Sequence, residues 1–479
     1  MTYITLNYYL FVLAVLIAYY ILPLKIRWAA LLAGNIGFYL LFYTSGWWVL
    51  GITIAISFIG GIMIPSLEGK AKKTVLFLSI LATLIPWFLV KNLNFLLEIT
   101  VKRDPINWIV PLGISFYTLQ LVSYLADVYK GKILPERNIA KFALFASFFP
   151  QLIQGPIPRY GQLQNQLITG HRFDENNIVK GFCYVIWGFF LKLMIADKAG
   201  VIVDAVFENY PAYSGIYIWA ASFLYSIQLY ADFLACTTLA QGVAKLFGID
   251  IADNFARPYF AVSIKDFWRR WHLSLSSWLR DYVYIPLGGN RKGTFRKYLF
   301  LVITFLVSGI WHGAGYKYLV WGGMHAFYQI AGDFTYRFRE RIYKAFHVSE
   351  KSGKKRLLKQ AGTFLLVNWA WIIFRADTLW LGTRMIKHMF TECNPWVLFN
   401  DQIFNLGLGW KEIAVLMLSV LLLRRVGKAH EEGRSVSNMI MSQRLVIRWG
   451  IYMTAIIGIM IFGTYGYGFN AQDFIYGGF

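Results

Sequence analysis

The chain has 479 residues, of which 57% are hydrophobic, 18% aromatic and only 15% charged. This composition excludes an ordinary water-soluble protein and predicts an all-α protein embedded in a bilayer. The formal charge of +22 would suggest nucleic acid in a soluble protein, but the basic residues lie mainly in short loops between apolar runs. The positive-inside rule and attraction to anionic lipids explain that distribution, so we expect membrane lipids and no nucleic acid as partners.

Apolar segments long enough to cross a bilayer recur along the chain. Four of them cover residues 6–22, 47–64, 74–90 and 449–462. By that length criterion we expect roughly ten to twelve membrane-embedded helices, all within a single domain over residues 1–470. The first segment lacks the basic flank and the small-residue cleavage site of a signal peptide, which indicates a retained helix.

The positions of lysine and arginine predict the orientation of these spans. Basic loops follow the first, third and fifth spans, and the loops 337–359 and 424–448 are also basic. Since Lys and Arg concentrate on the cytoplasmic side of a membrane, these loops predict an extracytoplasmic N-terminus. The last span then carries residues 471–479, here called the tail, to the outer face of the cell membrane.

An irregular segment interrupts the apolar pattern in "FFPQLIQGPIPRYGQL", which contains Gln151. Its three prolines within nine residues cannot continue a regular helix. Two interpretations are compatible with this pattern: a broken or re-entrant element that lines a cavity, and a surface loop between two spans.

His272 lies in "SIKDFWRRWHLSLSSWLRDYVYIPLGGNRKG". On one continuous helix, an aromatic stripe and a basic face would lie side by side. The stripe would carry Trp268, Trp271, Leu275, Trp278 and Tyr282, and the basic face Lys265, Arg269, His272, Ser276 and Arg280. Such a helix fits the membrane interface, where it could bind lipid headgroups. It also fits a cationic mouth for a phosphate-bearing acyl donor, with His272 directed inward.

His312 ends the apolar run "YLFLVITFLVSGIWH", and the following Gly-Ala-Gly permits a helix break. An imidazole at this depth can serve as a general base in a dry cavity, or as a core histidine that donates one hydrogen bond to a carbonyl. His325, thirteen residues later, would lie on another face of an unbroken helix, so we interpret it as structural.

Several sequence signatures are absent from the chain. It has no GxxxxGK[ST], HExxH or GxSxG motif, so ATP-driven transport and serine-hydrolase chemistry are not predicted. The three cysteines form no CxxC pair, and no metal site is expected.

The two histidine motifs, "DFWRRWHLSLSSWLRDYVYIPLGGNRKG" and "GIWHGAGYKYLVWGGMH", resemble the membrane-bound O-acyltransferase family. Within that family they are most similar to the bacterial polysaccharide and peptidoglycan O-acetyltransferase branch. Weaker agreement runs through "FFPQLIQGPIPRY", "NFARPYF" and "NWAWIIFRADT". The resemblance implies a ring of tilted helices, with re-entrant and interfacial helices, around a tunnel between a cytoplasmic donor funnel and an outer acceptor cavity.

The resemblance also implies roles for particular residues. His312 corresponds to the principal catalytic histidine and His272 to a second tunnel histidine. Beside these two roles, the basic face described above predicts donor contacts from Lys265, Arg269 and Arg280, and the tunnel-lining candidates are Trp311, Trp271, Gln151 and Ser276. The stretch after Asp232, in "YADFLACTTLAQG", departs from the small polar sequence usual in the family, which leaves the tunnel lining and the size limit of the donor open.

The ending "FIYGGF" resembles an F-x-Y-x-x-F hexapeptide that presents a tyrosine as a temporary acyl carrier in this branch. The implied function is transfer of acetyl from cytoplasmic acetyl-CoA to Tyr476, with His312 as base. An extracytoplasmic acetyltransferase of the serine-nucleophile type would then acetylate a cell-surface polysaccharide or peptidoglycan. Phe474 and Phe479 would anchor the hexapeptide in an apolar tunnel mouth. The alternatives are D-alanyl transfer to teichoic acid and a transporter for a glycan or lipid precursor.

Overall fold

The computed structural model describes residues 3–43, 46–102, 105–345, 349, 352–465 and 474. These residues form helices and connecting segments, and none of them lies in a strand, which confirms the all-α prediction. By its internal contacts the chain divides into two compact units. The described part of the first lies within residues 1–187 and 236–253, and that of the second within 188–235 and 254–475. The single domain over residues 1–470, and the ring around a tunnel, stay predictions.

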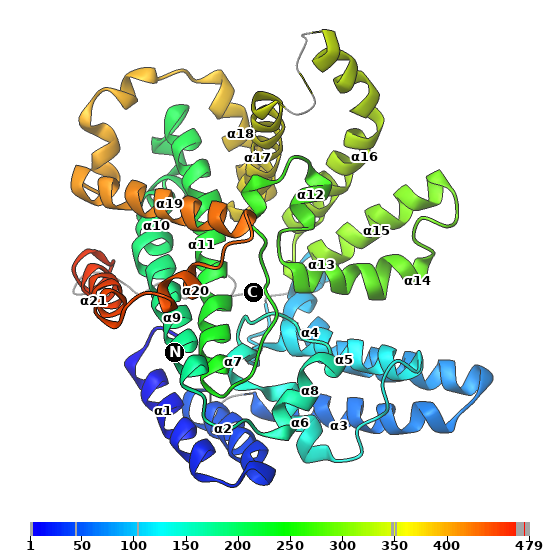
Figure 1. Ribbon diagram of the computed structural model, residues 1–479. Coiled ribbons are helices and arrows are strands. Elements are labelled where there is room, and N and C mark those ends of the chain that lie inside the picture. Colours follow the sequence, from blue (N-terminus) through cyan, green and yellow to red (C-terminus); the bar gives the residue numbers. More distant parts are fainter. Residues whose placement is uncertain are drawn as a thin grey trace. The chain divides into compact units, whose positions relative to one another are not determined.

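The first unit is built from short and long helices in chain order (Figure 1). They are α1 (Leu6–Ile21), α2 (Arg27–Phe42), α3 (Trp47–Met63), α4 (Gly69–Val101), α5 (Ile114–Tyr129), α6 (Ile139–Ser147), α7 (Phe149–Leu152), α8 (Tyr160–Thr169) and most of α9 (Glu175–Phe189), with the 3-10 turns η1 (Leu24–Ile26) and η2 (Ile64–Ser66). α3, α4 and α5 pack against one another, and α2 packs against α6 and α8.

The proline-rich segment is buried in this first unit. Asn35 of α2 accepts a hydrogen bond from the Phe149 N–H at 3.0 Å and donates to Ser147 Oγ at 3.1 Å. The Tyr3 hydroxyl donates to the Pro150 carbonyl at 2.8 Å. Since α7 and the residues after it are mostly buried, the surface-loop interpretation is wrong, and the broken-element interpretation agrees with the structure.

The second unit contains the two histidine motifs. Its helices are the π-helix η3 (Phe190–Ala196), α10 (Asp197–Glu208), part of α11 (Ile216–Leu246), α12 (Ile264–Trp268), α13 (Leu273–Leu279), the π-helix η6 (Arg280–Tyr284), α14 (Ile285–Leu287), α15 (Thr294–His312), α16 (Tyr316–Ala345), α17 (Gly353–Arg375), α18 (Leu379–Thr391), α19 (Trp410–Glu431), α20 (Val436–Met441) and α21 (Leu445–Phe462). The 3-10 turns are η4 (Tyr210–Ala212), η5 (Pro258–Phe260), η7 (Pro395–Leu398) and η8 (Asp401–Leu406).

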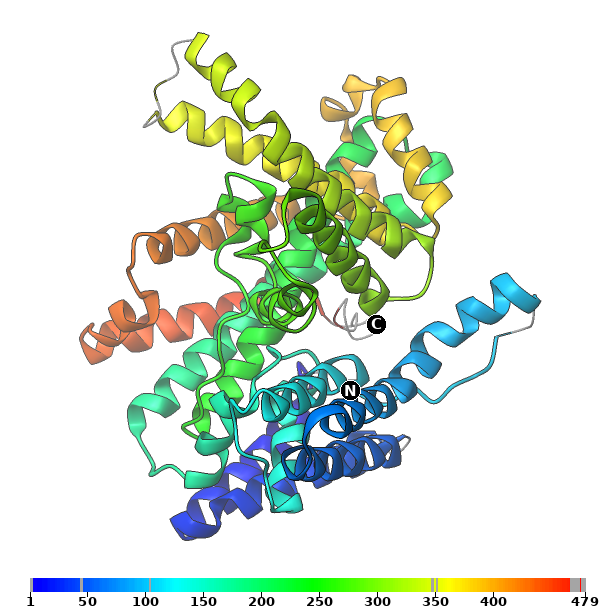
Figure 2. The same cartoon turned by 90° about the vertical axis from the view of Figure 1, so that its right-hand side faces the viewer.

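α15 and α16 approach each other closely because glycines lie at their contact. A Cβ on Gly309 would be 2.3 Å from the Tyr318 carbonyl oxygen, and one on Gly322 would be 2.4 Å from that of Phe305. A side chain at either position would therefore force the helices apart. α16 in turn packs against α17, and Figures 1 and 2 show these two helices side by side.

Among the described residues, six helical segments are long and apolar enough to cross a membrane. They are Trp47–Ser66, Gly69–Val101, Glu175–Glu208, Thr294–His312, Gly353–Arg375 and Leu445–Phe462, and α1 is a shorter apolar helix. The four spans named from sequence coincide with α1, α3, α4 and α21. Six is fewer than the ten to twelve predicted, because long helices such as α16 carry too many polar and charged residues to meet the criterion.

Candidate functional site

His272 lies at a break between two short helices. α12 ends at Trp268 and α13 begins at Leu273, and His272 itself has φ 46° and ψ 57°, in the left-handed region. That conformation costs a residue with a Cβ about 1–2 kcal/mol. The prediction of one continuous helix through this motif is therefore wrong. Trp271 and Trp278 are buried in the protein, so the predicted aromatic stripe does not face lipid along its length, and the interfacial interpretation stays a prediction.

Asn254 holds the chain at this break. Its backbone carbonyl accepts from the Leu273 N–H at 2.9 Å. Its side-chain oxygen Oδ1 accepts from the Ser274 hydroxyl at 2.8 Å and from the Ser274 N–H at 3.2 Å, and it lies 3.2 Å from His272 Nδ1. Asn254 is itself buried. Asn254 begins the segment "NFARPYF" that agrees with the family, but its spacing of eighteen positions from the histidine did not predict this contact.

The contact with Asn254 determines the tautomer of His272. Because Oδ1 of an amide is an acceptor only, the imidazole carries its proton on Nδ1 and keeps a lone pair on Nε2. His272 is almost completely buried, and Nε2 has no hydrogen-bond partner within the described part of the chain. Nε2 is thus a proton acceptor in a dry environment, as a general base requires.

His312 is the last residue of α15, and α16 begins at Tyr316, so the predicted helix break is confirmed. The imidazole is buried among aromatic rings. Its ring centroid lies 4.8 Å from that of Trp311 and 5.0 Å from that of Trp321. Trp311 also lies 5.9 Å from the His272 ring, so one indole contacts both histidines. The structure therefore brings the two predicted histidines into one cluster.

His325 belongs to the same aromatic cluster. Since the chain turns between α15 and α16, the helical-wheel argument that separated it from His312 does not apply, and Trp321 contacts both rings at 5.0 Å. The Trp268 indole N–H donates to His325 Nδ1 at 3.2 Å. This partner and the surrounding rings agree with the structural interpretation of His325, which stays a prediction.

Three of the four tunnel-lining candidates are buried, and Ser276 is half-buried. Trp311 and Trp271 are buried, and Ser276 donates its hydroxyl to the Trp271 carbonyl at 3.0 Å. Gln151 is buried in the first unit, and neither atom of its amide has a hydrogen-bond partner among the residues that the structure describes. A buried amide without partners is compatible with a polar lining. Their place along a tunnel stays a prediction.

The three predicted donor contacts are surface residues. Lys265, Arg269 and Arg280 are all exposed, and Arg280 pairs with the neighbouring Asp281 at 2.8 Å. With the continuous helix broken at His272, they do not form the single basic face that the sequence predicted. Their role as donor contacts stays a prediction.

Arg270, which follows Arg269 in the chain, has a structural role. Its guanidinium donates to both carboxylate oxygens of Glu431 at 3.1 and 3.0 Å and to Asp266 at 3.0 Å. Arg257 donates to the same Glu431 at 2.8 Å. The hydrogen bond from Arg270 lowers the pKa of Glu431 from its ordinary value, so the carboxylate stays charged at neutral pH. This network ties the histidine motif to the end of α19.

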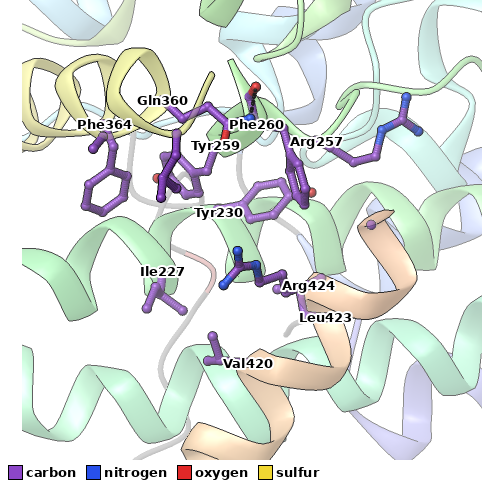
Figure 3. A pocket seen from close by; sticks show the side chains of 13 residues that line it. Ile227, Tyr230, Arg257, Tyr259, Phe260, Gln360, Phe364, Val420, Leu423 and Arg424 are labelled. Atoms are coloured by element: carbon purple, nitrogen blue, oxygen red, sulfur yellow. Dashed lines mark hydrogen bonds between the residues drawn. The ribbon is translucent and has the colours of Figure 1, made fainter. Parts of the chain in front are cut away.

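A cavity of about 300 Å³ lies beside this network, within the second unit (Figure 3). Its lining combines aromatic and aliphatic side chains with two arginines, and includes Tyr230, Tyr259, Gln360, Arg257 and Arg424. In Figure 3 the Arg424 side chain lies between the Tyr230 ring and Val420. Sequence reasoning missed this cavity because its walls come from α11, η5, α17 and α19, which are far apart in the chain.

The acyl-carrier prediction falls on Tyr476, which lies outside the described residues, as does Phe479. Phe474 is described and is buried. Its ring centroid lies 4.6 Å from Lys192 Nζ, so its surroundings include a charge and are not the purely apolar site that was expected.

Comparisons with known proteins relate the chain to acyltransferases. Residues 133–344 match the model of the membrane-bound O-acyltransferase family. The probable alginate O-acetylase AlgI of Pseudomonas putida is 38% identical over 323 residues, which cover 67% of this chain and 62% of that protein. The peptidoglycan O-acetyltransferase of Helicobacter pylori is 35% identical over 322 residues, covering 62% and 60%. The teichoic acid D-alanyltransferase of Bacillus subtilis is 29% identical over 315 residues, covering 62% and 76%.

The chain thus spans about three fifths of the length of the O-acetylases that it matches. The matched residues 133–344 include both His272 and His312 and the helix break at each of them. Together with the apolar helices, this match identifies a multi-pass membrane protein. The chain belongs to the membrane-bound O-acyltransferase family.

Proposed function

We propose that this chain transfers an acetyl group from cytoplasmic acetyl-CoA to Tyr476, which passes it to an extracytoplasmic acetyltransferase for O-acetylation of a polysaccharide or peptidoglycan. The observation that carries the proposal is that the buried imidazoles of His272 and His312 both contact the indole of Trp311. Nε2 of His272 has a lone pair and no hydrogen-bond partner among the described residues. The names of the alginate and peptidoglycan relatives support acetyl as the group and a glycan as its destination.

The first step uses the histidines as bases. His312, aided by His272, removes the proton from the Tyr476 phenol, and the phenolate oxygen attacks the thioester carbonyl of acetyl-CoA. A new C–O bond forms, the C–S bond breaks, and the CoA thiolate takes the proton from the imidazolium. The buried aromatic surroundings exclude water, which would otherwise hydrolyse the thioester.

The second step returns the acetyl group to a hydroxyl. The partner's serine attacks the acetyl ester of Tyr476, which regenerates the phenol, and the acetyl-serine then acetylates the glycan. With the tail outside the membrane, acetyl crosses the bilayer while CoA stays in the cytoplasm. The exposed cations Lys265, Arg269 and Arg280 would attract the phosphates of CoA on that side.

The test is acetylation of purified protein in lipid nanodiscs. With isotope-labelled acetyl-CoA and without the outer partner, mass spectrometry should find acetyl on the peptide that carries Tyr476, and free CoA should appear in equal amount. His312→Ala and Tyr476→Phe should both abolish the modification. A transporter would yield neither product, and an unmodified Tyr476 beside released CoA would refute the relay.

A second candidate is D-alanyl transfer, which the teichoic acid D-alanyltransferase relative favours because the match covers 76% of its length. The donor distinguishes the two. Acetyl-CoA alone should acylate Tyr476 if the first proposal holds, whereas the second requires a D-alanyl thioester on a carrier protein. Alanine substitution of Lys265, Arg269 and Arg280 together should raise the KM for acetyl-CoA without changing kcat.

A further inference from the structure

A buried ion cluster lies in the second unit. The Lys192 ammonium lies 2.8 Å from Asp197 Oδ1 and 2.8 Å from Asp232 Oδ1, and all three side chains are only 1% exposed. Lys192 comes from the π-helix η3, Asp197 is the first residue of α10, and Asp232 lies in α11.

The π-helix makes this pairing possible. Lys192 and Asp197 are five residues apart, which an α-helix would place about 140° apart around its axis. The i to i+5 hydrogen bonding of a π-helix places residues five apart above one another, so the ammonium and the carboxylate face each other. π-Turns of this kind are frequent at functional sites.

The cluster is incomplete as a structural ion pair. Two carboxylates surround one ammonium, and Asp197 Oδ2 is buried without a hydrogen-bond partner among the described residues. Removing charges from water costs several kcal/mol for each ion, and an orphaned oxygen adds to that cost. Apolar side chains of similar volume would often stabilise the fold equally well, so stability alone does not account for the cluster.

The residues after α21 meet this cluster at two points. The Thr464 N–H donates to the Leu193 carbonyl of η3 at 3.1 Å. Ten residues later, the buried Phe474 ring has its centroid 4.6 Å from Lys192 Nζ, within the range of a cation–π interaction. Asp197 and Asp232 both bind the Lys192 ammonium, so the two carboxylates fix the position of the cation that the Phe474 ring contacts.

We infer that Lys192, oriented by Asp197 and Asp232, is the docking point of the tail and positions Phe474. Tyr476 follows two residues later, so fixing Phe474 limits the region that the phenol can reach. Lys192 is a positioning residue in this scheme and does not itself touch the acetyl group. Its effect on transfer rests on the proposed function of Tyr476, whereas the docking of Phe474 does not.

The experiment measures docking and transfer separately. Hydrogen exchange of the peptide over residues 464–479 reports docking, and acetylation of Tyr476 reports transfer. Phe474→Leu keeps an apolar side chain but removes the ring, and should raise exchange of the tail by about 2- to 30-fold, the range expected for a lost cation–π contact. Phe474→Tyr, which keeps the ring, should restore protection. Phe462→Leu, at an exposed phenylalanine nearby, should change nothing.

A variant of the cluster itself provides the second arm. Lys192→Met combined with Asp197→Asn and Asp232→Asn removes all three charges at similar volume, without leaving a buried carboxylate unpaired. It should fold, release the tail to the same extent as Phe474→Leu, and slow acetylation without raising the KM for acetyl-CoA. Should the triple variant fail to fold, Phe474→Leu and Phe474→Tyr still decide the question.

The two proposals fail in different ways. Unchanged exchange of the tail in Phe474→Leu would overturn the docking inference even if Tyr476 is acetylated normally. Exchange that rises in Phe474→Leu, in a protein whose Tyr476 is never acetylated, would support the docking and refute the relay. Tyr476→Phe should lose transfer and keep a protected tail.

Discussion

Replacing Asn254 with alanine should damage the site through His272 without touching any reactant. The variant removes one buried oxygen that accepts from the Ser274 hydroxyl at 2.8 Å, from the Ser274 N–H at 3.2 Å and from His272 Nδ1 at 3.2 Å. Each buried donor left without a partner costs about 1–3 kcal/mol. Ser274 is half-buried and can turn to other acceptors, so we expect a loss of about 2–5 kcal/mol in the free energy of unfolding.

The effect on transfer follows from the tautomer. Loss of the Nδ1 contact removes about 1–1.5 kcal/mol of preference for the form with a lone pair on Nε2, which corresponds to about tenfold in rate. The assay is acetylation of Tyr476 in nanodiscs at equal protein concentration, below the unfolding temperature of every variant.

Two controls sharpen this experiment. Asn254→Asp keeps the acceptor oxygens, so its stability should fall less. Its negative charge favours the imidazolium, so transfer should need a higher pH. Asn209→Ala removes an exposed asparagine and should leave both readouts unchanged. An Asn254→Ala protein that unfolds and transfers acetyl as the wild type does would refute the reasoning.

Three further predictions concern the framework of the site. Glu431→Gln should lower the free energy of unfolding by about 1–3 kcal/mol at pH 7. Because Arg270 lowers the pKa of Glu431 in the folded protein, this contribution is complete above the carboxyl pKa of the unfolded chain and is lost as the pH falls through the pKa of the folded protein. The thermal unfolding curves of wild type and variant should therefore converge in acid. Gly309→Ala should destabilise by about 1–3 kcal/mol, since the new Cβ would be 2.3 Å from the Tyr318 carbonyl oxygen, while Gly323→Ala, with open space around it, should be neutral in the same melting assay. His325→Phe should retain transfer within about threefold, in contrast to a loss of about 10²-fold or more for His312→Ala, and equal losses in the two would contradict the structural interpretation of His325.

The sequence predicted the helices best where the signal was local. The long apolar runs became α3, α4 and α21, and the Gly-Ala-Gly after His312 ended α15 as expected. Length, hydropathy and glycine act within one stretch of chain, so they can be read without knowing the fold.

Prediction from the sequence failed where the backbone conformation depends on a partner that is distant in the chain. The motif around His272 has the periodicity of an amphipathic helix, but hydrogen bonds that Asn254 accepts hold His272 in a left-handed conformation that a helical wheel does not include. Lys192 was overlooked for a similar reason, because its partners Asp232 and Phe474 come from α11 and from the residues after α21. The cavity beside Arg257 is likewise assembled from four separate segments.

The π-helix that contains Lys192 depends on the number of residues in this segment. A π-turn amounts to an α-helix with one residue inserted, so an alignment gap of a single position between Phe190 and Ala196 would distinguish relatives with this turn from relatives without it. In a relative one residue shorter, a regular α-helix would keep the flanking turns in the same orientation, and the acidic partner, now four residues after the lysine, would stay on the same side of the helix. A relative of the same length without the π-turn would instead place the two residues about 140° apart, so the turn is what brings the carboxylate to the lysine that Phe474 contacts here.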